Sequence, residues 1–229
     1  MLNSYVLQVQ NLVHDSNETL YTYPNIVLWI NEGRRQLAME SQSCRAMATA
    51  TASGNIITFA SVTPPTGMSA LLDVRKVWPT SSSAPPISMR SWEWYVQFYA
   101  NNLLGTAPTE WCQYADGVNG AIYLNGTGGG TLNLDGVWLP VDLVSDATPE
   151  AIPVPWQDAV KYFAAYLAYA NSQRSADAQA MLELFSGFTA SARKMSRPTV
   201  LPYLLARDHS QGSMTEGDLA LPRGQAPGR

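Results

Sequence analysis

Two helices folded back on each other, residues 155–171 and 175–195, are the feature of this sequence that most constrains its fold. Pro155 suits the first turn of a helix, where its missing N–H costs nothing. Apolar residues then recur at helical spacing; they are Trp156, Val160, Phe163, Leu167 and Ala170. A second stripe, on another face, consists of Tyr162, Tyr166 and Tyr169. A helix that is apolar on most sides must be covered on most sides, so we expect it at the centre of a bundle or between subunits.

The second of these helices follows a short polar turn, and Ser175 is placed to cap it. Its apolar residues repeat at the same spacing; they are Met181, Phe185, Phe188, Ala192 and Met195. Arg193 and Lys194 lie near its C-terminal end, where the helix dipole favours cations. The stretch therefore predicts an antiparallel helical hairpin.

Composition indicates a chain that is covered by other protein. Hydrophobic residues make up 46% of the 229 residues and charged residues only 14%, below the usual quarter. The chain also holds 7 Trp and 11 Tyr, and aromatic enrichment with charge depletion marks interface cores. The net charge of −4 argues against a basic nucleic-acid footprint.

The sequence shows neither a signal peptide nor a membrane span. Its first ten residues lack a basic segment followed by a long apolar run. The longest apolar stretch, residues 159–170, contains Lys161 and is too short to cross a bilayer. Cys44 and Cys112 have no CxxC spacing, which favours two reduced thiols. We expect a protein synthesised in the cytoplasm of a cell, with no membrane partner.

Two further helices are predicted nearer the N-terminal end, residues 5–12 and 24–41. Gly33 lies inside the second and costs about 1 kcal/mol relative to alanine. We therefore expect a close helix crossing at Gly33. Arg34 and Arg35 follow it and, with the three tyrosines above, are candidates for facing a channel or an interface.

After residue 42 the hydrophobic period changes from 3.6 to 2, which predicts strands. Residues 46–52 and 56–59 flank a Ser-Gly-Asn turn and predict a hairpin. Further strands are predicted at residues 71–78, 111–116, 121–124 and 131–139, with a glycine-rich turn at 125–130. The aromatic spacing in residues 91–103 favours a helix within this block.

The last segment of the chain predicts an extended arm. Its apolar residues, flanked by Pro198 and Pro202, are Val200, Leu201, Tyr203, Leu204 and Leu205. Residues 209–229 are rich in Gly, Ser and Pro and cannot bury enough apolar surface to fold alone. We expect the five apolar residues to contact a partner.

Together these elements predict an α+β fold, a helical bundle built on the C-terminal hairpin with an inserted antiparallel β domain. The expected divisions are residues 1–43 for the first helices and 44–150 for the β domain. Residues 151–197 form the hairpin and residues 198–229 the arm.

Catalytic signals are weak. His14 and His209 lie in polar surroundings, and a general base must be held within hydrogen-bond reach of its target. No GxSxG, HExxH, Walker A or Rossmann pattern is present. The glycines at 126–130 lack the Lys-Ser/Thr of a phosphate loop and lead into a strand. We predict no catalytic residue, no cofactor-binding residue and no metal ligand.

Two other groups of residues leave alternatives open. The cations Arg34, Arg35, Arg75, Lys76 and Arg90 line a nucleic-acid groove or are solvated and ion-paired. The low net charge favours the second interpretation. The aromatic run at residues 92–95 is either a stacking platform or part of a core or interface. Helical spacing favours the core or interface.

Several short motifs occur in a characteristic order over residues 23–197. NEGRRQL at 31–37 lies in an early helix, and PTEW at 108–111 with IYL at 122–124 forms a β hairpin. IPVP at 152–155 then leads into an Ala/Tyr-rich helix, and the final helix ends in basic residues. This order resembles the head-to-tail adaptor proteins of tailed bacteriophages, the group that includes tail tubular protein A of short-tailed phages.

The resemblance implies a non-enzymatic virion protein at the head–tail junction. Copies would form a homo-oligomeric ring, commonly of twelve, beneath the portal protein, and would receive the next tail or nozzle protein. Double-stranded DNA would pass through without specific binding, and the arm would dock on the portal or on a neighbouring subunit. The alternatives are another structural tail component, such as a terminator or baseplate part, and a carbohydrate-binding module suggested by the many Trp and Tyr residues.

Overall fold

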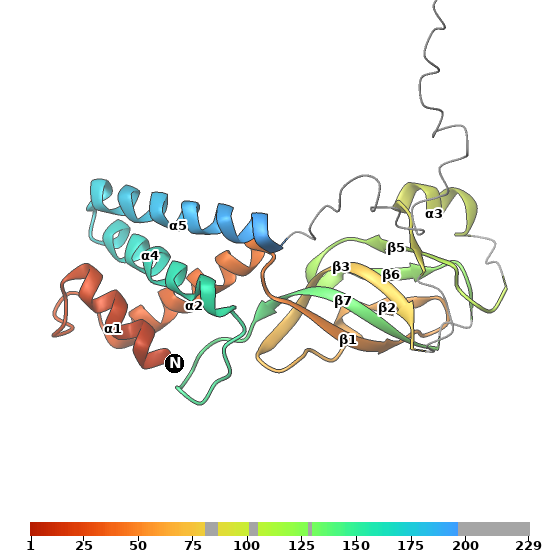
Figure 1. Ribbon diagram of the computed structural model, residues 1–229, viewed down its shortest axis with the longest axis horizontal. Helices are drawn as coiled ribbons and strands as arrows, with labels where there is room; N and C mark the ends of the chain where they lie inside the picture. Colours follow the sequence, from red (N-terminus) through yellow and green to blue (C-terminus); the bar gives the residue numbers. More distant parts are fainter. Residues whose placement is uncertain (81–86, 101–104, 128–129, 197–229) are drawn as a thin grey trace, which may run out of the picture. The chain divides into compact units, whose positions relative to one another are not determined.

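The protein has the mixed α+β architecture that the sequence predicts. The computed structural model describes residues 1–80, 87–100, 105–127 and 130–196 (Figure 1). Four helices form a helical lobe: α1 (Leu2–Val13), α2 (Tyr23–Ser41), α4 (Val154–Asn171) and α5 (Ser175–Ser196). Seven strands and the short helix α3 (Trp92–Phe98) are inserted between α2 and α4 and form a β lobe. The predicted arm lies outside the described residues.

The α4–α5 hairpin is confirmed, and α4 is the central helix of its lobe. It packs against α5, α2 and α1 (Figure 1). Its fully buried positions are mostly small; they are Ala159, Val160, Ala164, Ala165 and Ala168. The larger residues of the predicted stripe, such as Phe163, are only half-buried, and Met195 at the end of α5 is exposed. Alanines bring the neighbouring helices close, and the aromatic side chains then fill the margins of the contact.

Gly33 is where α2 approaches α4 most tightly, as the sequence predicts. A Cβ added to Gly33 would lie 3.2 Å from both the Cβ of Phe163 and the carbonyl oxygen of Val160. That separation is shorter than ordinary van der Waals contact between such atoms. Glycine at this position lowers the helix propensity of α2, but it permits the close crossing with α4.

The first sheet of the β lobe has three strands in the order β1-β7-β3, and all its pairs are antiparallel. They are β1 (Arg45–Thr51), β7 (Thr131–Pro140) and β3 (Met68–Pro79). The central strand, β7, is buried at most positions, whereas β1 alternates between exposed and covered residues. This alternation shows that one face of β1 is open to solvent.

The second sheet has four strands in the order β2-β6-β5-β4. They are β2 (Ile56–Thr58), β6 (Ala121–Leu124), β5 (Glu110–Tyr114) and β4 (Ser88–Met89). The predicted β5–β6 hairpin is confirmed. The pairing of β4 with β5 is parallel, so the β lobe is not antiparallel throughout.

The predicted hairpin of residues 46–52 with 56–59 is wrong. The turn is present, with a single bridge between Ser53 and Ile56, but β1 pairs with β7 and β2 pairs with β6. The two strands therefore belong to different sheets. Side chains from both sheets meet in one hydrophobic cluster that includes Trp111 and Trp138, and burying those large residues outweighs a local hairpin.

Helix α3 is shorter than the predicted helix at residues 91–103. It ends at Phe98, and residues 101–104 lie outside the described part of the chain. The Ser91 side chain caps the helix by accepting a hydrogen bond from the backbone N–H of Trp94 at 3.2 Å. Short 3₁₀ turns occur at Phe59–Ser61 and Gly117–Asn119.

Candidate interaction surfaces

Arg34 does not face a channel or solvent; it is a buried anchor inside the helical lobe. Its side chain is fully buried, and its Nη2 lies 2.7 Å from Oε1 of Glu150. Its Nε donates to the same carboxylate at 3.1 and 3.2 Å, which makes the ion pair bidentate. Its Nη1 donates to the carbonyl oxygen of Val141 at 2.6 Å and to Oδ1 of Asn31 at 3.2 Å. Arg34 thereby fixes the segment that returns from the β lobe to α4.

Asn31 completes this anchor, one helical turn before Arg34. Its Oδ1 accepts from the Leu143 backbone N–H at 2.8 Å, and its Nδ2 donates to the Leu143 carbonyl at 3.1 Å. The Glu150 carboxylate also accepts the Ile152 backbone N–H at 2.8 Å. The polar residues of the NEGRR stretch therefore satisfy buried backbone groups that would otherwise lose water without compensation. The sequence alone did not identify Glu150 as the partner, although it is the acidic residue of a proline-flanked loop.

Two weakly acidic groups lie beside this anchor. The Tyr5 hydroxyl is buried and has no hydrogen-bond partner among the described residues. Burial, and next the negative charge of Glu150, raise the pKa of Tyr5 far above its usual value. Burial likewise raises the pKa of Cys44 to about 12, and Cys112 in the β lobe shows the same effect. Both cysteines are free, as predicted, and at neutral pH both remain protonated and unreactive.

Arg35 is partly exposed and forms surface ion pairs. It contacts Glu32 at 2.7 Å and Asp142 at 3.3 Å, with about half of each acidic side chain exposed. Such pairs contribute only about 0–1 kcal/mol. Arg35 is therefore accessible for a subunit contact, in contrast to Arg34.

The three tyrosines of α4 differ in burial. Tyr169 is buried, and its hydroxyl donates to the Leu12 carbonyl at 2.8 Å, which ties α4 to α1. Tyr162 is half-buried and stacks on Phe188 of α5, with ring centroids 5.6 Å apart. Tyr166 is also half-buried, against Phe163. Only Tyr162 and Tyr166 leave area for another molecule. The five apolar arm residues, Val200, Leu201, Tyr203, Leu204 and Leu205, lie outside the described residues.

An aromatic surface lies around α3. Trp92 contacts Tyr95, Tyr114 and Tyr123, with ring centroids 4.6–5.7 Å apart. The aromatic run at residues 92–95 is therefore packed against the β5–β6 hairpin. Sequence analysis did not identify Tyr114 and Tyr123 as part of this cluster, although their positions on a predicted hairpin could have placed them together. Around this cluster Met89, Val96, Phe98 and Tyr114 are about half exposed.

Polar contacts hold the edge of this aromatic surface. Arg90 lies 4.9 Å above the Trp94 ring and forms an ion pair with Glu110 at 2.7 Å. Tyr99 donates its hydroxyl hydrogen to Glu110 at 3.0 Å. An apolar centre with a polar rim is the usual composition of a protein–protein interface.

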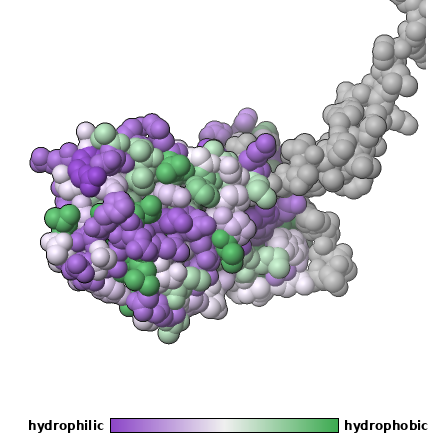
Figure 2. Space-filling view, turned by 60° about the vertical axis from the view of Figure 1, so that its left-hand side comes forward, coloured by the Kyte–Doolittle hydropathy of each residue, from purple (hydrophilic) through white to green (hydrophobic). Residues whose placement is uncertain are grey.

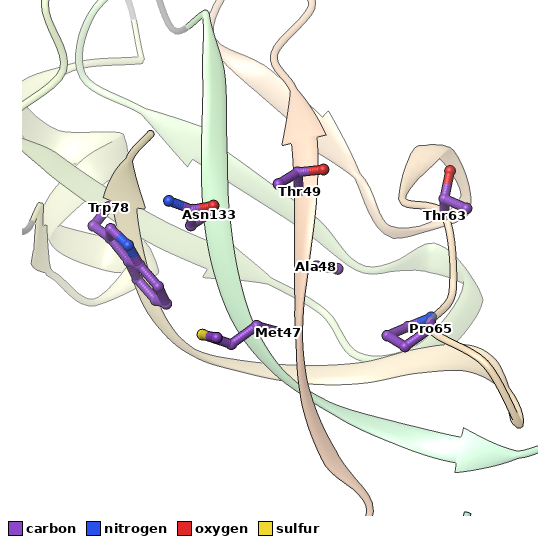
Figure 3. A pocket seen from close by; sticks show the side chains of 7 residues that line it. All are labelled: Met47, Ala48, Thr49, Thr63, Pro65, Trp78 and Asn133. Atoms are coloured by element: carbon purple, nitrogen blue, oxygen red, sulfur yellow. The ribbon is translucent and has the colours of Figure 1, made fainter. Parts of the chain in front are cut away.

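An open pocket extends across the first sheet, from Trp78 on β3 to the loop that carries Thr63 and Pro65 beside β1 (Figure 3). Its volume is about 490 Å³. Its lining residues are Met47, Ala48, Thr49, Thr63, Pro65, Trp78 and Asn133. In Figure 3, Thr63 and Pro65 lie on one side of β1, and Trp78 and Asn133 lie on the other. The residues are apolar or neutral, so the pocket offers shape and hydrogen bonds rather than acid–base chemistry.

A second open groove, of about 610 Å³, lies between the ends of α2 and α5. Its lining residues are Glu40, Ser186, Thr189, Ala190, Arg193 and Lys194. The two cations are the basic C-terminal end predicted for α5. On the face shown in Figure 2, hydrophobic residues lie in separate patches between hydrophilic ones.

The described residues contain no cluster of three or more potential metal ligands. His14 is exposed and ends α1, and His209 lies outside the described residues. None of the described helices is long and apolar enough to cross a membrane.

A family described as SU10 adaptor protein matches residues 6–205. The chain belongs to the SU10 adaptor protein family. Membership in this family implies that the protein is a structural phage adaptor rather than an enzyme. No curated protein matches the chain.

Proposed function

We propose that this adaptor forms a ring of identical copies beneath the portal protein, at the junction between head and tail. The ring extends the channel for DNA and provides the attachment site for the next tail or nozzle protein. The family match over residues 6–205 is the observation that carries the proposal, because it spans both lobes and the start of the arm.

The surfaces described above support a subunit with several neighbours. Tyr162 and Tyr166 on α4 and the aromatic surface around α3 are half-buried and available for contact. The apolar arm residues Val200 to Leu205 would add an attachment to the portal or to a neighbouring subunit. Ordering such a segment costs entropy, which a docking surface must offset.

The net charge of −4 supports passage of double-stranded DNA without specific binding. Tight binding of DNA requires Lys and Arg contacts to several phosphates. In the described part of the chain, Arg34, Arg45 and Arg90 are each paired with a carboxylate. A channel wall of this composition leaves the DNA free to slide.

The test is electron microscopy of the full-length protein mixed with portal rings of the same phage. The proposal expects an additional ring of density on one face of the portal. Mass measurement should show that the free chain is monomeric or weakly associated. A chain that never binds the portal, or that binds glycans as a monomer, would contradict the proposal.

A further inference from the structure

We propose that the free edge of β1 accepts, as an added strand, residues 199–205 of a neighbouring copy of this chain. The inference rests on the proposed function, because it requires copies that lie side by side. The proposed function allows the arm to dock on the portal or on a neighbouring subunit. The inference names one docking surface, the edge of β1 in a neighbouring subunit.

The first observation is the hydrogen-bond pattern of β1. Its sheet order makes β1 an edge strand, paired only with β7 within the described residues. The ladder is bounded by bonds from the Trp138 N–H to the Cys44 carbonyl, at 2.8 Å, and from the Ala52 N–H to the Gly130 carbonyl, at 3.0 Å. Even-numbered residues of β1 therefore bond to β7, because antiparallel strands alternate in this way.

It follows that the backbone groups of Met47, Thr49 and Thr51 point away from β7. Within the described parts of the chain, no backbone hydrogen bond reaches them. Exposed edges of this kind are usually blocked by charge, proline or a covering segment, because they can pair with another strand. Only Arg45, at the start of β1, is charged, and β1 contains no proline.

The second observation is the space beside this edge. The pocket of about 490 Å³ spans β1, from Trp78 and Asn133 over the sheet on one side to Thr63 and Pro65 on the side of the free edge (Figure 3). Met47 is 70% exposed there. An added strand would lie in the part of this opening between β1 and Thr63, at the spacing of about 4.8 Å that sheet pairing requires.

The third observation is the spacing of prolines in the arm. An edge strand tolerates proline only where its missing N–H would face solvent. Pro198 and Pro202 are four residues apart, so in an extended strand both face the same side. With the prolines outward, the N–H groups of the odd-numbered residues from Thr199 to Leu205 face β1. The arm therefore has an unbroken row of donors on one side.

The side chains of the arm suit both faces of β1. Residues that pair directly lie on the same face of a sheet. Leu201 and Tyr203 would then lie on the open face, beside Met47, while Val200 and Leu204 would lie on the face of half-buried Ala48. Every apolar arm residue gains contact, which explains a segment too apolar for a solvated tail.

Symmetry favours a neighbouring copy as the source of the strand. The arm and the β1 edge are two different surfaces, so their contact between copies is head-to-tail. Head-to-tail interfaces generate closed rings when the rotation between copies closes. The proposed ring needs a contact of this kind in every copy.

The test uses the full-length chain and two matched variants, Leu201→Pro and Val200→Pro, each assembled on portal rings. Hydrogen exchange of residues 45–52 is measured in the free chain and in the complex. For the natural chain and Val200→Pro, we expect the amides of Met47, Thr49 and Thr51 to exchange about tenfold more slowly, or slower still, in the complex. Leu201→Pro removes an N–H that faces β1 and should abolish this protection.

A photo-cross-linker placed at Tyr203 identifies the partner. The proposal expects covalent dimers of this chain with the cross-link in residues 45–52. A cross-link to the portal, slow exchange already in the free chain, or protection that persists when residues 199–229 are deleted would each overturn it. If the complex forms but exchange does not change, the strand pairing is wrong while the proposed function holds. If the natural chain forms no complex, the proposed function fails and the inference fails with it.

Discussion

The helical lobe and the β lobe bury their apolar residues in different ways. The core of the helical lobe contains many alanines, and a buried ion pair between Arg34 and Glu150 lies at its side. The core of the β lobe contains the large side chains of Trp111 and Trp138, together with branched aliphatic residues from both sheets. The helical lobe is therefore stabilised by close approach of its helix backbones and by one buried ion pair. The β lobe is stabilised by the complementary packing of large side chains.

The two lobes also differ in what they leave open. In the helical lobe α4 is covered by three helices, and the exposed residues are scattered along α1, α2 and α5. In the β lobe the edge of β1 has backbone groups without a partner among the described residues, and α3 adds half-exposed aromatic side chains. The comparison indicates that the helical lobe maintains the subunit and that the β lobe offers more of the binding surface.

The largest expected effect is on the polar anchor of the helical lobe. Glu150→Ala leaves the fully buried Arg34 without its counter-ion, so we expect a loss of about 3–5 kcal/mol in the free energy of unfolding. Urea denaturation measures this loss. The control is Asp142→Ala, which removes an exposed partner of Arg35 and should cost about 0–1 kcal/mol. Equal effects of the two variants would show that the buried pair is not an anchor.

The tight packing of the β lobe can be tested at Gly120. A Cβ added there would overlap the ring of Phe59, which is buried and cannot swing into solvent. Gly120→Ala should therefore destabilise the protein by about 1–3 kcal/mol, measured by urea denaturation. Adding Phe59→Leu makes room for the methyl group. Gly120→Ala should therefore cost less stability in the Phe59→Leu background than in the natural chain. An equal cost in both backgrounds would show that steric crowding is not the cause.

Acid should weaken the loop that joins α1 to α2. Burial by itself raises the pKa of Asp15, but hydrogen bonds from Thr19, Tyr21 and Leu20 outweigh it and hold the pKa below its usual value. A depressed carboxyl pKa stabilises the fold above the unfolded value, about 3.9. This contribution is lost as the pH falls through the lower, folded pKa.

The measurement is the free energy of unfolding as a function of pH, for the natural chain and for Asp15→Asn. The natural chain should lose stability below about pH 4 more steeply than the variant. Parallel curves would show that the hydrogen bonds to Asp15, which include the Tyr21 N–H at 2.8 Å, do not favour its charged form.

A small effect of opposite sign is expected on the exposed face of α5. No neighbouring atom of the described residues lies within 4 Å of a Cβ added to Gly187. Gly187→Ala should stabilise the protein by about 0.4–1 kcal/mol, because alanine restricts the unfolded chain and favours a helix. Thermal unfolding measures the gain. A destabilised variant would mean that α5 packs against something at this position.

The smallest effect on the isolated subunit is expected for deletion of the residues after Pro198. The melting temperature should change little, since the described core clusters lie before this point. Recovery of tailed particles should nevertheless be lost, because the arm would no longer dock. A collapse of the melting temperature would show that the arm packs on its own subunit, and normal particles would show that the arm is a passive tail.

The helices were predictable because their signals are local. Spacing of apolar residues placed all four long helices within a few residues of their observed ends, and Gly33 marked the crossing of α2 and α4. The short helix α3 was placed correctly but predicted too long. Its aromatic spacing continues beyond Phe98, although the contacts of Trp92 and Tyr95 with the β5–β6 hairpin determine the packed part.

The partners of strands and polar residues were less predictable. The alternation of residues 46–52 identified a strand but not its partner, β7, which lies about eighty residues further along the chain. Arg34 was equally ambiguous, since an arginine in a helix can face solvent, a channel or a buried acid. Glu150, its partner, is distant in sequence and gives no periodic signal.

By itself, the sequence determined where most helices and strands form and a composition suited to a structural subunit, and it predicts the apolar arm. These properties follow from short-range periodicity and from the types of residue present. Only the tertiary structure decided that β1 and β2 belong to different sheets and that Arg34 is an internal anchor. It also decided that the outer edge of β1 is unpaired within the described part of the chain. The physical reason is that strand pairing and charge burial depend on residues far apart in the sequence. They are determined by the burial of Trp111, Trp138 and the α4 alanines in the two cores, and not by neighbouring residues in the chain.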